Sequence, residues 1–195
     1  MGNIPIAHTN YSFLLTTKSI SDMKFSIEKG RQVLERTPFV TKAMLQGLSD
    51  EWVLTNEGGD TWSPADVIAH LIYCDRLNWL LRAKHIFKYK DAKPFAPFDR
   101  TGGLEVSKSK SLDQLLEEFL RVRKEVLEEI RDLQISEEDI AANGLRPQFG
   151  EVTLSQLLSA WVAHDLSHLS QVCRVMAKQF KEEVGPWITY LKLLN

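Results

Sequence analysis

The chain has 195 residues, with 24 basic and 26 acidic side chains and a formal net charge of −2 at pH 7. A chain of this length fits one domain and hides about 70% of its unfolded surface on folding, so it needs no disulfides to form a core. Hydrophobic residues make up 44% and charged residues 26%, which excludes a disordered chain. The near-neutral charge gives no positive field to hold a phosphate backbone, so we expect no nucleic-acid partner.

We expect a cytoplasmic protein with no membrane partner. Cys74 and Cys173 lie in apolar helical patterns without a CxxC motif, which is typical of a reducing compartment. Polar residues interrupt the uncharged first 17 residues, so they do not resemble a signal peptide. No stretch is long and apolar enough to span a bilayer. We assign residues 1–24 to an N-terminal extension and residues 25–195 to one helical domain.

Apolar residues at three- and four-residue spacing predict helices in the first half of the chain. Residues 26–48 are predicted to form a short helix and then a longer one, because Pro38 after Thr37 suits a cap and first turn. Ser63 and a following proline are typical of a helix start, and the helix is predicted to run over residues 64–89. A long connection with prolines and glycines follows.

Two more long helices are predicted in the second half. Ser111 and Gln114 have the capping-box spacing, and the helix after them is predicted over residues 112–133. An irregular stretch over 135–152 precedes a helix predicted from Leu154 to about residue 180. A short tail helix or turn is expected around residues 187–193.

No segment alternates apolar and polar residues for long enough to predict a sheet. Four main helices joined by two crossings of fifteen residues or more predict an all-α four-helix bundle with long connections. A homodimer is possible in such a bundle.

Three of the five histidines face the predicted core. His164 and His168 are one turn apart, so both imidazoles leave the same side of the last long helix, within its apolar stripe. His70 faces inward from the 64–89 helix, where a helical wheel places Leu77 and Leu81 within about 20° of it. An unpaired buried polar group costs about 1 to 3 kcal/mol, and a shared cation satisfies two imidazole nitrogens at once.

These three histidines could supply three neutral nitrogens to one metal ion and leave at least one position open, as in catalytic sites. Nitrogen ligands favour Zn²⁺, Ni²⁺ or Fe²⁺ over Mg²⁺ and Ca²⁺. The alternative is a set of core histidines bonded to backbone or water. His8 and His85 lack such a context and are expected at the surface or in loops. No GxxxxGK[ST], GxGxxG or GxSxG motif supports phosphate-loop, dinucleotide or hydrolase-elbow chemistry.

Other side chains near the three histidines have open interpretations. Gln171 could orient a ligand or nucleophile, or it could be a glutamine at a helix edge. Cys74, one turn after His70, would close the site as a fourth ligand, but we favour a small buried hydrophobic residue. Asp165 lies about 100° around the helix from His164 and is not expected to face the metal.

The residues around these histidines resemble a known family. Trp62-Ser63-Pro64, the following His70, and the run from Trp161 to Gln171 are similar to the DinB/YfiT-like superfamily of DNA-damage-inducible-type four-helix bundles. The C-terminal Gly185-Pro186-Trp187 resembles one branch of it. Arg146 departs from the pattern, since relatives often carry histidine there. The resemblance implies a divalent metal bound through His70, His164 and His168.

The resemblance also implies a kind of chemistry. Characterised branches use the metal with low-molecular-weight thiols, which predicts a metal-dependent enzyme of thiol-transfer type that acts on a small molecule. In such an enzyme the metal lowers the pKa of a thiol. A metal-dependent hydrolase, in which the ion lowers the pKa of water, is the second hypothesis. A stress-linked metal-binding protein without turnover and a bundle with purely structural histidines are the others.

Overall fold

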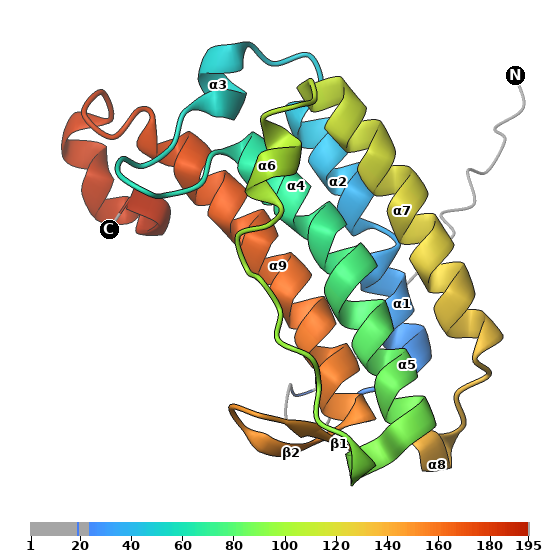
Figure 1. Ribbon diagram of the computed structural model, residues 1–195. Helices are drawn as coiled ribbons and strands as arrows, with labels where there is room; N and C mark the ends of the chain where they lie inside the picture. Colours follow the sequence, from blue (N-terminus) through green and yellow to red (C-terminus); the bar gives the residue numbers. More distant parts are fainter. Residues whose placement is uncertain (1–18, 20–23, 195) are drawn as a thin grey trace, which may run out of the picture.

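Four helical columns lie side by side in the computed structural model, which describes residue 19 and residues 24–194 (Figure 1). The expected all-α four-helix bundle is confirmed. The columns are, in chain order, α1 (Ile27–Leu34) with α2 (Thr37–Leu45); α4 (Pro64–Cys74), a π-helical turn (Asp75–Trp79) and α5 (Leu80–Tyr89); α7 (Leu112–Asp132); and α9 (Leu154–Lys178).

Short elements lie at the two ends of the bundle, except for α6 (Leu104–Ser107), which lies alongside α4 (Figure 1). They are α3 (Asp50–Leu54), α6, α8 (Glu137–Ile140), strands β1 (Asn143–Arg146) and β2 (Gly150–Thr153), and 3₁₀ turns at Lys90–Ala92, Gly185–Tyr190 and Lys192–Leu194. In the part of the chain that the structure describes, no helix combines the length and the apolar character that crossing a membrane requires.

The second and third columns run in the same direction, which explains the long connection between them (Figure 1). The chain leaves α5 at the end of the bundle that carries β1 and β2, and residues 90–111 return to the opposite end. The backbone N–H of Phe95 donates to the carbonyl of Leu145 at 2.9 Å and ties the start of this path to β1. Farther along, Gly103 lies so close to α4 that a Cβ there would be 3.0 Å from Cα of His70. The connection therefore passes directly over the helix that carries His70.

The helix starts confirm the capping predictions. Ser63, Ser111 and Thr153 each form a complete capping box with the residue three positions later. Thr37, in contrast, is already inside α2 and does not cap it, and its hydroxyl donates to the carbonyl of Val33 at 3.2 Å. The first column is two helices, and the second, with 9 residues, is longer than the first, with 8 residues, by one residue only.

The prediction that the chain contains no sheet was wrong. β1 and β2 form an antiparallel hairpin in which Asn143 pairs with Thr153 and Arg146 with Gly150. Each strand has only four residues, too few for apolar and polar alternation to stand out. Gly150 has φ of 75°, which glycine adopts without strain.

The helix predicted over residues 64–89 is present with those bounds, but it is not α-helical throughout. Residues Asp75–Trp79 form a π-helical turn, in which hydrogen bonds join residues five positions apart instead of four. This shifts the phase of the residues within and after the turn, so Leu77 and Leu81 are each 49% exposed instead of facing the core. Asn78 and Trp79 are buried in their place.

Candidate metal centre

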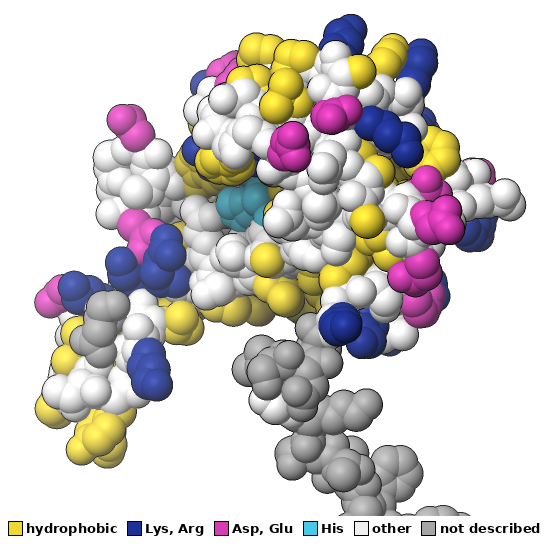
Figure 2. All heavy atoms as spheres, turned by 90° about the horizontal axis from the view of Figure 1, so that it is seen from below, with side chains coloured by type: hydrophobic (Ala, Val, Ile, Leu, Met, Phe, Trp, Pro, Cys, Tyr) yellow, Lys and Arg dark blue, Asp and Glu magenta, His cyan; other side chains and the backbone are white. Residues whose placement is uncertain are grey.

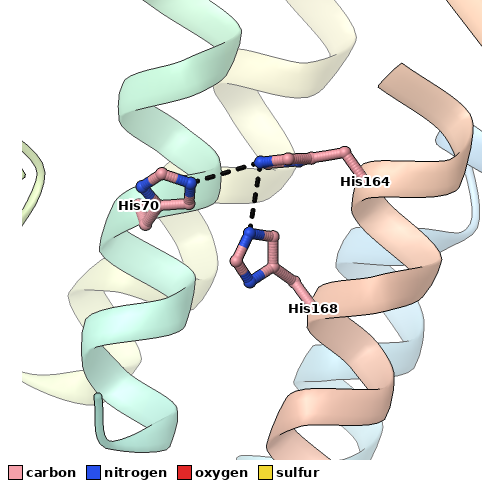
Figure 3. A group of neighbouring side chains, drawn as sticks. All are labelled: His70, His164 and His168. Atoms are coloured by element: carbon pink, nitrogen blue, oxygen red, sulfur yellow. Dashed lines mark hydrogen bonds between the residues drawn. The ribbon is translucent and has the colours of Figure 1, made fainter. Parts of the chain in front are cut away.

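Three histidines from two columns converge on one point (Figure 3). His70 comes from α4, and His164 and His168 come from successive turns of α9. Nε2 of His164 lies 3.2 Å from Nε2 of His70 and 3.1 Å from Nε2 of His168. The ligand atoms of all three lie within 4.8 Å of one another. Among the described residues, no other group of three or more histidine, cysteine or acidic side chains meets this condition.

These spacings fit a metal ion. Two nitrogens bound to a tetrahedral Zn²⁺ at about 2.0 to 2.1 Å are about 3.3 to 3.4 Å apart. Without a metal ion, Nε2 of His164 would have to form hydrogen bonds to two other imidazole nitrogens, although it carries at most one proton. Its other ring nitrogen, Nδ1, is buried without a hydrogen-bond partner. The donor set therefore fits a divalent cation of the type that prefers imidazole.

The site keeps its imidazoles neutral, which is the state that binds a metal. Burial, and then the neighbouring His168, lower the pKa of His70 to about 4. Burial and the two other histidines lower the pKa of His164 to about 3. Burial also lowers the pKa of His168, although its hydrogen bond to Gln171 opposes this. At neutral pH all three therefore offer lone pairs.

Gln171 lies where it can orient His168. Its Oε1 is 2.8 Å from Nδ1 of His168. An amide oxygen only accepts, so Nδ1 carries the proton and Nε2 of His168 is left free to bind. A partner on the far nitrogen of a metal-binding histidine fixes both the tautomer and the ring orientation.

His70 has further partners on its own side of the site. Sγ of Cys74 is 3.3 Å from Nε2 of His70, and the backbone of Arg100 hydrogen-bonds to the same imidazole. Cys74 lies outside the group of converging ligand atoms. Burial, and then Asp75 and Asp165, raise the pKa of its thiol to about 12, so it is a neutral thiol. That it is no fourth ligand stays a prediction.

Two tryptophans form walls around the site. The ring of Trp62 is 4.6 Å from that of His70 and stacks on His168 at 6.0 Å, with 12° between the planes. The ring of Trp79 meets His164 edge-on at 5.1 Å. Figure 2 shows histidine colour at the base of a hollow, with hydrophobic side chains beside it, on the face seen from the end of β1 and β2. His164 and His168 are only partly buried, so the bundle encloses this region without sealing it.

A buried ion network, which the sequence analysis missed, lies in the same part of the core. Arg123 donates to both carboxylate oxygens of Asp75, at 2.7 and 3.0 Å, and to both of Asp165, at 2.6 and 3.2 Å. All three side chains are at most 2% exposed. The sequence held a signal, because each residue follows a buried apolar residue by one helical turn: Leu71, Phe119 and Trp161.

The other predictions for individual residues have mixed outcomes. Asp165 points to Arg123, in keeping with the expectation that it does not face the metal. His85 lies apart from the three histidines, and its Nε2 is 2.8 Å from the carbonyl oxygen of Lys93. His8 lies outside the described residues.

Comparisons with known proteins agree with this geometry. The family model described as the DinB superfamily matches residues 34–172. Among solved structures, YfiT from Bacillus subtilis matches with a TM-score of 0.63 and 21% sequence identity over 77% of this chain and 89% of its own. YfiT is described as a probable metal-dependent hydrolase with an unusual four-helix bundle topology. No curated protein sequence matches the chain. With most of its length matched by the family model, the chain belongs to the DinB superfamily.

Proposed function

We propose that this protein is a metal-dependent enzyme of thiol-transfer type that acts on a small molecule at the three-histidine site. The observation that carries the proposal is the convergence of three Nε2 atoms, at 3.1 and 3.2 Å, from His70, His164 and His168. Three protein ligands leave a position for a substrate, as in catalytic sites. Zn²⁺, Ni²⁺ and Fe²⁺ all suit an imidazole set.

The protein's own residues define what can join at the open position. Three neutral imidazoles do not compensate the charge of a divalent ion, so an anionic nucleophile is the favoured partner. A bound ion would supply Lewis acidity, which lowers the pKa of a thiol or of water there. Gln171 would hold His168 in the metal-binding tautomer, and Trp62 and Trp79 would limit the access of water.

The surroundings favour a thiol over water as the nucleophile. Among the described residues, no carboxylate belongs to the cluster of ligand atoms, and Asp75 and Asp165 are both engaged by Arg123. Hydrolysis of an amide needs a group that passes a proton to the leaving amine. Thiol transfer needs less: a carbon–sulfur bond forms, the leaving group departs with its electron pair, and the thiol proton passes to solvent.

Hydrolysis is the second candidate, because the structurally similar YfiT is described as a probable metal-dependent hydrolase. The same neutral ligand set could serve either nucleophile. A metal-binding protein without turnover is the outcome that would replace both.

The first experiment tests the metal. Protein purified without a histidine tag and loaded with Zn²⁺ is expected to hold about one ion per chain, and His70→Ala and His164→Ala are expected to lose it. His85→Ala is the matched control, since this histidine lies outside the cluster, and it should retain the ion. Equal metal content in all four proteins would overturn the site.

The second experiment tests the reaction. The loaded protein is incubated with small thiols and a chromogenic aryl halide, and separately with ester and amide substrates. Thiol-dependent turnover that chelation abolishes and Zn²⁺ restores would support transfer, and thiol-independent cleavage would support hydrolysis. Tight metal binding with neither reaction would support the non-catalytic alternative.

A further inference from the structure

Three arginines on segments near the site have no acidic partner among the described residues. They are Arg82 on α5, Arg100 in the long connection and Arg146 at the end of β1. Among residues 24–194, no ion pair involves any of them, whereas Arg123 binds two carboxylates. Unpaired arginines near a partly enclosed site suggest that their partner is a ligand.

Arg82 is held in place by rings and not by charges. Its Cζ lies 5.3 Å from the ring centre of Phe95 and 5.7 Å from that of Phe98, within cation–π range. Burial, and then the nearby charge of Arg146, lower its pKa. Arg82 is also close enough to Cys74 to oppose the rise in the thiol's pKa. Arg82 follows Trp79 by three residues in the same helical column, so the two side chains are neighbours on one face of the helix. The ring of Trp79 meets that of His164 at 5.1 Å, which places Arg82 one helical turn from a ring that borders the three-histidine cluster.

Arg146 and Arg100 complete the positive group. Cζ of Arg146 lies 4.2 Å from the ring centre of Phe149, and its Nε is buried without a hydrogen-bond partner. Arg100 hydrogen-bonds to His70 through its backbone, and its charge contributes, after burial and the other histidines, to the low pKa of His164.

The charges of this region do not balance. Three guanidinium groups on segments that border the site have no carboxylate partner among the described residues, and the buried carboxylates of Asp75 and Asp165 are already shared by Arg123. A divalent ion on the histidines would increase the excess. Arg82 packs on the ring of Phe95 at 5.3 Å, and the backbone N–H of Phe95 bonds to the carbonyl of Leu145, the residue before Arg146. An anion that binds between Arg82 and Arg146 relieves the repulsion between these two like charges.

We propose that the substrate carries an anionic oxygen group, a carboxylate or a phosphate, which binds between Arg82 and Arg146 beside the metal. This inference rests on the proposed function for its metal, but the arginines themselves do not depend on it. Guanidinium groups bind both kinds of oxyanion with two parallel hydrogen bonds. The arginines would hold one end of the substrate and leave its reactive group near the three histidines.

Calorimetry on the Zn²⁺-loaded protein tests the proposal with three probes: succinate, inorganic phosphate and the neutral analogue succinamide. We expect at least one anion to bind and succinamide not to bind. Arg82→Met and Arg146→Met should weaken that binding by about 10- to 100-fold, the effect of losing hydrogen bonds to a charged group. Arg82→Lys should weaken it less, and Arg131→Met, at an exposed site on α7, should leave it unchanged.

The outcomes separate this proposal from the metal site. Zinc content is measured on every variant and should remain at the wild-type level, because neither arginine is a ligand. Succinate binding without phosphate binding identifies a carboxylate, and the reverse identifies a phosphate. Equal binding of succinamide, no anion binding, or binding that Arg82→Met and Arg146→Met leave unchanged would overturn the proposal. If the protein takes up no zinc but still binds an anion through the arginines, the metal centre is contradicted and this proposal stands.

Discussion

Replacing Arg123 with methionine tests the role of the buried ion network. Its guanidinium makes five hydrogen bonds: four to Asp75 and Asp165 and one, of 2.8 Å, to the carbonyl of Leu34. These partners lie on the first, second and fourth helical columns, while Arg123 lies on the third. Methionine keeps the apolar stem but leaves two buried carboxylates without a counter-charge.

The size of the effect follows from what is left behind. A hydrogen bond to a charged group contributes about 1.5 to 3 kcal/mol, but five of them do not add, because burying the guanidinium is itself costly. Removing one partner of a buried ion pair costs about 3 to 5 kcal/mol. We therefore expect Arg123→Met to lower the free energy of unfolding by about that amount at pH 7.

The pH dependence gives the prediction a sign. Burial already raises the pKa of Asp75, and Arg123 is the main opposing influence. Without it, the carboxyl pKa in the folded variant lies well above the unfolded value, so the folded state binds more protons than the unfolded state. Protonation then stabilises the fold, and the deficit should shrink as the pH falls from 7 to 5.

Urea unfolding followed by circular dichroism measures both effects. Arg121→Met is the matched control on the same helix, since the Arg121 side chain is 56% exposed and its one ion pair among the described residues is with Glu125. We expect this control to lose less than about 1 kcal/mol. A loss below about 1 kcal/mol for Arg123→Met, or a deficit that does not change with pH, would refute the reasoning.

Three further predictions concern the metal site. Gln171→Ala should weaken zinc binding by about 10- to 100-fold, because His168 loses the partner that fixes its tautomer; competition with a chromogenic chelator measures this, and unchanged affinity would contradict the role. Cys74→Ala should leave the zinc content at the wild-type level, and loss of the ion would make this cysteine a ligand. Zinc affinity should vary little between pH 5.5 and 7, because the pKa values of His70 and His164 are about 4 and about 3. The same values predict that the apoprotein loses stability as the pH falls from about 6.5 towards 4, because over this range the histidines gain protons in the unfolded state but not in the folded state. Proton release on zinc binding, measured by calorimetry in buffers of different ionisation enthalpy, checks the first part, and release of more than one proton at pH 6 would contradict it.

The inward direction of the three histidines was predictable, because it depends on local periodicity. His164 and His168 lie in one unbroken helix, so their spacing alone places them on one face. His70 precedes the π-helical turn, and its direction was also predicted correctly. Leu77 lies within that turn and Leu81 follows it, and their predicted direction failed because the wheel assumed α-helical spacing throughout.

The sequence by itself determined the long helices, their capping boxes and which histidines face the core, because these features depend on residues within a few positions of one another. Only the tertiary structure decided that His70 meets His164, 94 residues away, and that Arg123 binds Asp75 and Asp165 from two other helices. The same holds for the hairpin, whose first strand is fixed by Phe95 of the crossing connection. These features depend on packing between segments that are far apart in the sequence, and the sequence alone does not specify which buried charges pair. The physical reason is that hydrogen bonds and ion pairs inside a core are selected by the whole fold, whereas helical periodicity is set residue by residue.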